Sequence, residues 1–366
     1  MASDTDATAD LATVVNLADF EQLARVAMEP TAFDYYAGGA SDELTLDDNP
    51  RAWQRWRLRP RILVDVSQVN TTASLLGAQT VLPVGIAPMA FQHLAHESAE
   101  PAMAAAAARQ GVVFCLSTMS SRSMEEVARA ADKAGGGPRW FQLYVHRDRA
   151  RSADLVRRAA AAGYGAIVLT VDLPVAGRRE RDSRNQLPYP EAYGNFELPA
   201  ANAKGGTLPV VIGGLNDSAL SWADLAWLRE LTALPLVIKG ILTAEDAALA
   251  VEHGADGVWV SNHGGRQLDR TSATADVLAD LVGAVAGRAE VYVDGGIRRA
   301  TDVLIALAMG ARAVFIGRPL AFALAAAGEY GAIRALDIVA AELRNDMALL
   351  GVTRLDRLGG EYLVRG

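Results

Sequence analysis

The segment "WVSNHGGRQLD" (259–269) places a histidine after an apolar run and directly before two glycines. His263 is one of only five histidines in the 366 residues, and Arg266 follows it by three positions. Imidazole titrates near neutrality and suits general-base catalysis, while a guanidinium can bind a carboxylate through two parallel hydrogen bonds. The segment therefore indicates either an ordinary polar turn or a catalytic base that faces an anionic substrate.

A catalytic histidine needs an orienting group, and Asp172 in "TVDLP" is a candidate. A carboxylate bonded to one ring nitrogen fixes the tautomer and stabilises the imidazolium that forms during reaction. Arg179 in "GRRERD" supplies a second guanidinium, which could clamp a carboxylate together with Arg266. Two other interpretations stay open, since residues 178–184 could be a solvated charge run and Asp172 could cap a turn.

Lys239 lies inside the apolar run "LVIKGIL", and Gln142 lies inside "RWFQLYV". An unpaired buried charge is very costly, so we expect an anionic or strongly polar partner for Lys239. The alternatives are a lysine whose ammonium reaches solvent at a strand end, or a nucleophile that forms a Schiff base.

Two glycine-rich turns occur late in the chain, "DGGIRR" (294–299) and "IGRP" (316–319). Glycines let backbone N–H groups approach phosphate oxygens, and a helix that follows adds the positive end of its dipole. Arg298 or Arg318 could pair with the phosphate charge. Together the turns favour a phosphorylated ligand over plain turns.

The elements that must position these residues alternate regularly along the chain. Eight short apolar runs, separated by amphipathic segments, cover residues 83–88, 112–117, 139–145, 166–172, 235–240, 257–262, 290–296 and 313–319. Alternation of strand and helix predicts parallel pairing, and eight units is the number in a (β/α)8 TIM barrel, an α/β fold. The alternative is an open doubly wound sheet, but no glycine-rich dinucleotide turn opens the first unit.

In such a barrel the active site collects at the C-terminal ends of the strands. The candidate residues at those ends are Pro88, Met89, Ala90, Ser117, Gln142, Tyr144, Thr170, Asp172, Lys239, Ser261, His263, Asp294, Gly317 and Arg318. We predict one domain over residues 1–366, with a helical segment (1–80), the barrel (81–330) and one long C-terminal helix (330–366). The barrel rhythm breaks over about 175–220, where we expect a long lid loop after the fourth strand.

Composition narrows the class of protein further. The chain is 51% hydrophobic and 21% charged, with a formal net charge of −8. No run of lysine and arginine is present, which argues against nucleic acid and acidic membranes as partners. The single cysteine, Cys115, cannot form an internal disulfide and favours the cytoplasm. We expect no secretory signal, no membrane span and no metal site.

With these motifs the chain resembles the FMN-dependent L-2-hydroxy-acid oxidases, the family of glycolate, lactate and hydroxymandelate oxidases and of flavocytochrome b2. The resemblance covers about residues 17–351, and "SNHGGRQLD" is nearly diagnostic. The other matching motifs are "FDYYAGGASDELTL", "RPRIL", "APMAFQHLAH", "FQLYV", "TVDLPVAGRRERD", "LVIKG", "DGGIRRATDV" and "GARAVFIGRP".

The resemblance implies a role for each candidate residue. His263 would be the base, Asp172 would pair with its imidazolium, and Lys239 would stabilise the reduced flavin. The residues that would hold the substrate are Tyr35, Tyr144, Arg179 and Arg266. The residues that would hold FMN are Ala87, Pro88, Met89, Ala90, Ser117, Gln142, Thr170 and Ser261 at the ring, Asp294 at the ribityl chain, and Gly296, Arg298, Gly317 and Arg318 at the phosphate.

The implied reaction oxidises an (S)-2-hydroxy acid to a 2-oxo acid and reduces O2 to H2O2. The resemblance also implies a homotetramer. The alternatives are a dehydrogenase that passes electrons to a quinone or other carrier, an aldolase with Lys239 as Schiff base, and a flavin-binding module without catalysis. Met119 and Met89 stand where glycolate oxidases carry tryptophan and threonine, which favours a lactate-like or larger aliphatic or aryl substrate. Ala90 stands where mandelate dehydrogenase-like members carry glycine, which favours the oxygen-using branch.

Overall fold

A computed structural model describes residues 11–186, 194–196 and 215–366 of the chain. Eight parallel strands form a closed barrel, so the TIM-barrel prediction is confirmed and the open sheet is wrong. Each predicted apolar run coincides with one strand, and only β8 extends beyond its run, by one residue. The strands are β4 (Val84–Ile86), β5 (Val113–Leu116), β6 (Arg139–Leu143), β7 (Ile167–Thr170), β8 (Leu236–Ile241), β9 (Gly257–Val260), β10 (Glu290–Val293) and β11 (Ala313–Ile316).

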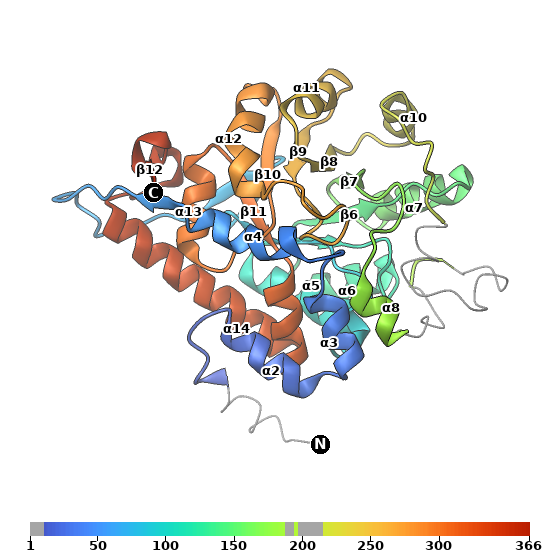
Figure 1. Cartoon of the computed structure of the whole chain (residues 1–366), viewed down its shortest axis with the longest axis horizontal. Helices are drawn as coiled ribbons and strands as arrows, with labels where there is room; N and C mark the ends of the chain where they lie inside the picture. The colour runs from blue at the N-terminus through green and yellow to red at the C-terminus, as the bar shows by residue number, and fades with distance from the viewer. Residues whose placement is uncertain (1–10, 187–193, 197–214) are drawn as a thin grey trace.

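Helices surround the barrel and bury their apolar faces against it (Figure 1). Several begin at a side-chain cap, since Ser123, Asp148 and Thr243 each accept a backbone N–H of the first turn. The helices that follow the strands are α5 (Ala99–Gln110), α6 (Met124–Lys133), α7 (Arg149–Ala161), α10 (Asp224–Leu231), α11 (Ala244–Glu252), α12 (Thr274–Val285), α13 (Ala300–Ala308) and α14 (Arg318–Leu350).

Residues 11–80 cover both ends of the barrel. Three helices, α2 (Asp19–Ala27), α3 (Pro30–Ala37) and α4 (Leu44–Trp53), precede short strands β1 (Trp56–Leu58), β2 (Ala73–Leu75) and β3 (Ala78–Thr80). Trp53 on α4 donates its indole N–H to the carbonyl of Gly295 at 2.8 Å, so α4 packs at the C-terminal end of the barrel. The β2–β3 hairpin places the fully buried Leu75 among the residues that fill the lumen.

The C-terminal helix differs from its prediction at both ends. It begins at Arg318, directly after β11, and bends at Ala327 and Gly328, whose backbone angles are not helical. It ends at Leu350 because Gly351 adopts a left-handed conformation (φ 76°), a common helix stop. The remaining residues form two 3-10 turns, η3 (Leu355–Arg357) and η4 (Gly360–Tyr362), and strand β12 (Leu363–Arg365), which pairs with β1.

The predicted lid loop contains one element that the sequence did not indicate, the short helix α8 (Glu180–Asn185). Residues 187–193 and 197–214 of this loop lie outside the described residues. Another short turn, η1 (Gln92–Leu94), follows β4. Within the described residues, no helix has the length and apolar character needed to cross a membrane.

The side chains in the lumen form two layers of opposite character. Alternate residues of a strand face the same side, so positions two apart stack along the barrel axis. The middle layer is fully buried and contains the aromatic residues Trp140, Trp259, Tyr292 and Phe315. Two positions further along their strands, or along neighbouring ones, lie polar residues of an upper layer: Ser117, Gln142, Thr170, Lys239, Ser261 and Asp294.

Candidate active site

A cavity opens above this polar layer, at the C-terminal ends of the strands. All but two of the residues predicted for the site line it, and the lining members are Tyr35, Ala87, Pro88, Met89, Ala90, Ser117, Gln142, Tyr144, Thr170, Arg179, Lys239, His263, Arg266, Asp294, Gly296, Arg298, Gly317 and Arg318. The two others do not line the cavity, but each forms a hydrogen bond with a residue that does: Asp172 with His263, and Ser261 with Lys239. Sequence reasoning missed the lining residues Tyr36, Leu173, Ala176, Gly264, Gly295, Ile297, Phe315 and Ile316.

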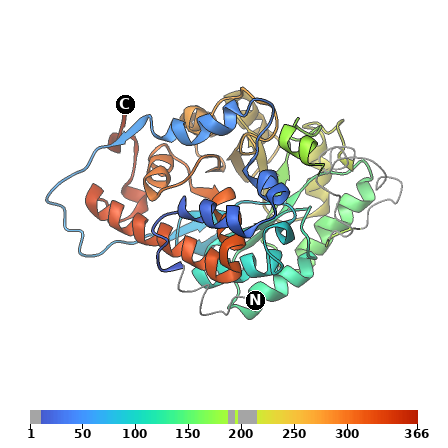
Figure 2. The same ribbon diagram turned by 60° about the horizontal axis from the view of Figure 1, so that its bottom comes forward.

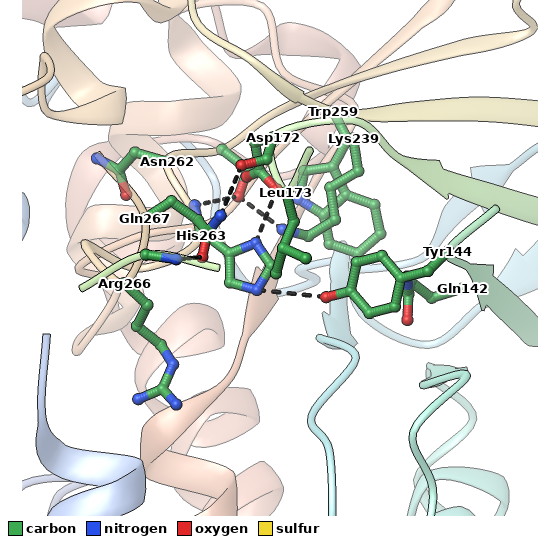
Figure 3. A network of polar contacts seen from close by, with 12 residues as sticks. Gln142, Tyr144, Asp172, Leu173, Lys239, Trp259, Asn262, His263, Arg266 and Gln267 are labelled. Atoms are coloured by element: carbon green, nitrogen blue, oxygen red, sulfur yellow. Dashed lines mark hydrogen bonds and ion pairs between the residues drawn. The ribbon is translucent and has the colours of Figure 1, made fainter. Parts of the chain in front are cut away.

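His263 and Asp172 form the predicted pair. The histidine Nδ1 lies 2.8 Å from Asp172 Oδ1, and Nε2 lies 3.4 Å from the Tyr144 hydroxyl (Figure 3). An ionised carboxylate only accepts hydrogen bonds, so Nδ1 carries the proton and the Nε2 lone pair is available as a base. Gly240 makes room for this pair, since a Cβ there would lie 2.6 Å from the Cβ of Asp172.

Burial sets the protonation state of the pair. It lowers the pKa of His263 below its usual 6.5, against the opposing effect of Asp172, and Lys239 adds to the lowering. Burial alone would raise the pKa of Asp172, but His263 and Lys239 together outweigh it and lower that pKa. At neutral pH the imidazole is therefore neutral and the carboxylate is ionised, as a general base requires.

This arrangement predicts the pH dependence of catalysis. The base must be unprotonated, so kcat/KM should fall as the pH drops through the pKa of His263, and that limb should lie below pH 6.5. Asp172→Asn removes the charge that raises the histidine pKa, so the limb should move to still lower pH while kcat drops about 100-fold or more. Steady-state rates across pH check both. A limb above pH 6.5 in the wild type would contradict the assignment.

Arg179 and Arg266 lie side by side near the histidine, without a carboxylate partner in the part of the chain that the structure describes. Arg179 is 8% exposed, and its Nε donates to the carbonyl of Arg266 at 3.2 Å. Arg266 donates to the carbonyls of Tyr35 and Gly38. Burial, and then the charge of Arg266, lower the pKa of Arg179 to about 10. Arg179 is buried and Arg266 is partly buried, and neither has a carboxylate within salt-bridge distance among the described residues, so the pair favours an anion between them.

The alternative of a solvated charge run is wrong for Arg179 and Asp182 and right for Arg178 and Arg184. The side chains of Arg178 and Arg184 are 84% and 71% exposed, while Asp182 is buried with Arg179. Helix α8 places residues 179 and 182 on its inner face. Gln267 was not singled out by the sequence, yet its amide bonds Arg179, Gly177 and the carbonyl of Asp172 and so joins both halves of the site.

Lys239 has the polar partners that its position requires. Its Nζ lies 3.1 Å from Asp294 Oδ2 and 2.6 Å from Ser261 Oγ, and the side chain is 6% exposed. Trp259 also donates its indole N–H to Asp294 at 3.0 Å. The ion pair stabilises the ammonium form, which is not a nucleophile, so the geometry disfavours the Schiff-base alternative.

The two glycine-rich turns come together in the wall of the cavity, with Arg298 and Arg318 among its lining residues. Burial lowers the pKa of both arginines, which again indicates a site for negative charge. Gly317 caps the N-terminus of α14, a helix end that attracts anions. Gly296 has an additional reason to be glycine, because a Cβ there would lie 2.3 Å from the carbonyl oxygen of Asn49 on α4.

The fold and the site define a class of protein, a TIM-barrel enzyme that holds a phosphorylated cofactor and an anionic substrate around a histidine base. The chain belongs to the FMN-dependent dehydrogenase family, whose model matches residues 24–365.

Individual relatives agree with this membership. The chain is 49% identical over 357 residues to the L-lactate oxidase of Nostoc sp. (95% of this chain, 98% of the relative). It is 45% identical over 358 residues to the glycolate oxidase of Spinacia oleracea (96% and 95%). Among solved structures, mandelate oxidase with (S)-4-hydroxymandelic acid is 42% identical, with a TM-score of 0.89 over 96% of this chain and 98% of that chain.

The residues of the cavity fit FMN. Gln142 Nε2 and Thr170 Oγ1 are buried without a hydrogen-bond partner among the described residues, and both groups belong to cavity-lining side chains. A buried orphan donor is costly unless a ligand satisfies it, and a flavin ring carries donors and acceptors along its edge. The two arginines at the glycine-rich turns match the charge of a terminal phosphate. The prediction of FMN as cofactor is therefore confirmed.

Proposed function

We propose that the protein oxidises (S)-2-hydroxy acids to 2-oxo acids with FMN and reduces O2 to H2O2. The observation that carries the proposal is the neutral His263, held by Asp172, in the same cavity as the buried Arg179 and the partly buried Arg266, which have no carboxylate within salt-bridge distance in the described residues. A base beside a carboxylate clamp is what proton removal from a 2-hydroxy acid requires.

The chain's own residues would act as follows. Arg179 and Arg266 bind the substrate carboxylate and fix its orientation. His263 Nε2 accepts a proton from the substrate, and Asp172 stabilises the imidazolium that results. The hydroxyl of Tyr144, beside that nitrogen, donates to the substrate hydroxyl or carboxylate. The ring of Tyr35 lies 4.9 Å below the guanidinium of Arg266 and supports the clamp.

When bound, FMN supplies an acceptor for two electrons and a donor to O2. Lys239 would compensate the negative charge that arrives with those electrons, which accounts for a buried cation in an apolar strand. The residues that would hold the ring are Ala87, Pro88, Met89, Ala90, Ser117, Gln142 and Thr170. Ser261 would orient Lys239 and Asp294, Asp294 would hold the ribityl chain, and Arg298, Arg318, Gly296 and Gly317 would hold the phosphate.

The wall beside the histidine supports a substrate larger than glycolate. Met119 and Leu173 are buried apolar residues of this wall, and Met89 and Ala176 line it as well. Unbranched methionine side chains adapt to different shapes, and alanine leaves volume for a substrate side chain. We therefore favour lactate-like or larger aliphatic and aryl 2-hydroxy acids.

An anaerobic titration tests the activity. Purified protein should be yellow, and (S)-lactate or (S)-mandelate should bleach the flavin faster than glycolate under argon. Admission of air should restore the colour, with one H2O2 for each 2-oxo acid formed. Bleached flavin that regains its colour with a quinone but not with air would favour the dehydrogenase alternative. Colourless protein that cannot take up FMN would exclude both.

A homotetramer in the cytoplasm completes the proposal, and an exposed apolar segment supports the assembly. Ile62, Leu63 and Val64 are 83%, 101% and 42% exposed, and Figure 2 shows this light-blue stretch at the outer edge of the molecule. Contiguous exposed apolar residues often mark a protein interface. Cys115 is buried and unpaired, as suits a reducing compartment.

A double substitution tests the role of this segment. Ile62→Ser with Leu63→Ser should leave FMN content and the fold unchanged, because both side chains already face water, but should reduce the assembly to smaller species in light scattering. Val26→Ser is a matched control, since this exposed residue (88%) lies on α2. An intact assembly in the double variant would show that other surfaces hold it.

A further inference from the structure

The lumen beneath the cavity is filled by four aromatic rings from different strands. Ring centroids lie 3.9 Å apart for Trp259 and Phe315, 5.2 Å for Trp140 and Tyr292, 6.3 Å for Trp259 and Tyr292, and 6.5 Å for Trp140 and Trp259. Branched aliphatic residues dominate the lumens of such barrels. Here three of the four rings are indole or phenol, the side-chain rings that give up an electron most readily.

Glycines elsewhere in the barrel make this filling possible. A Cβ at Gly85 would lie 2.3 Å from the ring of Phe315, and one at Gly257 would lie 2.9 Å from the ring of Tyr292. The two strands β4 and β9 therefore leave space that the rings occupy. Packing by smaller aliphatic residues would not need these glycines.

The upper end of the aromatic cluster reaches the cofactor cavity. Trp259 donates its indole N–H to Asp294 at 3.0 Å, and its ring lies 5.4 Å from the ammonium of Lys239 (Figure 3). Asp294, Lys239 and Phe315 all line the cavity. A carboxylate at the N–H stabilises an indole that has lost an electron. The opposing charge of Lys239 is largely compensated, since Asp294 pairs with it at 3.1 Å.

The lower end has an acceptor for a proton. The hydroxyl of Tyr292 donates to Glu290 Oε2 at 2.6 Å, and the Glu290 side chain is 26% exposed. The backbone N–H of Leu76 at 3.2 Å and the guanidinium of Arg312 at 3.9 Å also face this carboxylate. Burial and then Glu290 raise the pKa of Tyr292, so the phenol is protonated at rest. A phenol that loses an electron becomes a strong acid and needs such a base.

We propose that Trp259, Trp140 and Tyr292 form a relay for single electrons between the FMN cavity and the N-terminal end of the barrel, terminating in the Tyr292–Glu290 pair. Bound oxidised FMN, when excited by blue light, would supply a one-electron acceptor, and Trp259 would give up the electron. Tyr292 then donates an electron to the oxidised Trp259, directly or through Trp140, and transfers its phenolic proton to Glu290. The flavin gains one electron, Tyr292 loses one electron and one proton, and Glu290 gains the proton.

The relay would direct an oxidising equivalent away from the reactive side chains of the site. Met89 and Met119 line the cavity, and their thioethers are readily oxidised. An oxidising equivalent that reaches Tyr292 lies instead at the opposite end of the lumen, beside the partly exposed carboxylate of Glu290. The inference rests on the proposed function only through the binding of FMN.

A laser flash tests the relay on FMN-loaded protein without substrate. Transient absorption and freeze-trapped electron paramagnetic resonance should detect a tyrosyl radical in the wild type. Tyr292→Phe keeps the ring and should abolish that signal, leaving a tryptophan radical. Trp259→Phe should abolish the radicals of the relay, and Glu290→Gln should slow tyrosyl formation without removing a ring. Trp222→Phe is the matched control, because this ring stacks on His253 outside the lumen.

The outcomes separate the relay from the proposed function. A tyrosyl signal that survives in Tyr292→Phe would come from Tyr35, Tyr36 or Tyr144 at the cavity and would overturn the relay. The same holds if no radical forms in a wild type that binds FMN and is bleached by a 2-hydroxy acid, since the rings would then serve only as core. A wild type that binds FMN but is not bleached would overturn the proposed function alone.

Discussion

His263→Ala should lower the rate at which a 2-hydroxy acid reduces the flavin by about 10²–10⁴-fold, the range for loss of a general base. The protein should stay yellow, because the imidazole contacts Asp172 and Tyr144 and no group that would hold the phosphate. Anaerobic stopped-flow measurement of the bleaching rate gives the effect directly. The variant should also lose the acidic limb of the pH profile that the wild type shows.

His253→Ala is the control for a general effect of removing a histidine. His253 is exposed and stacks on Trp222 at 5.7 Å, outside the barrel lumen. The His253→Ala variant should bleach its flavin at the same rate as the wild type. If His263→Ala bleached as fast as the wild type, the base would be another group, and the pairing with Asp172 would be only structural.

Arg179→Lys should raise KM for the hydroxy acid by about 10–100-fold, since a bidentate charge-assisted pair contributes about 1.5–3 kcal/mol. Lysine keeps the charge but lacks the planar fork that bonds both carboxylate oxygens. The variant should still bind FMN, because the arginines at the phosphate turns are different residues. Steady-state kinetics and titration with the 2-oxo acid product both measure the loss.

Arg178→Lys is the matched control, because it makes the same charge-conserving substitution at the neighbouring residue. It neighbours Arg179 but is 84% exposed and pairs only loosely with Glu180 at 4.0 Å. Its kinetics should be unchanged. An equal effect of the two substitutions would mean that the segment acts through its overall charge, and an unaffected Arg179→Lys would leave Arg266 as the sole clamp.

Much of the barrel could be predicted because its signal is local. Each strand is a short apolar run and the segments between the strands have helical character, so the eight units follow from the pattern in the chain. The strand ends then bring Lys239, His263 and Asp294 to one rim, whatever the details of packing. The long C-terminal helix was misplaced because its bend at Gly328 and its stop at Gly351 depend on single backbone angles.

Residues that act through distant partners were the ones that sequence reasoning missed. Gln267 joins Arg179 to Asp172 only because segments almost a hundred residues apart meet above the barrel. Tyr36 and Ile297 lie inside quoted motifs but were assigned no role, and they line the cavity because α3 and the turn after β10 face it. No local pattern distinguishes such residues from ordinary core.

The sequence by itself determined the fold class, the family and the polar residues at the strand ends, because each depends on residue types at short spacing. Only the tertiary structure decided which arginines face the cavity without a carboxylate ion pair in the described residues, which nitrogen of His263 is free, and that four aromatic rings pack together beneath the cofactor cavity. These properties depend on burial and on contacts between strands far apart in the chain, where desolvation and geometry set charge and reactivity.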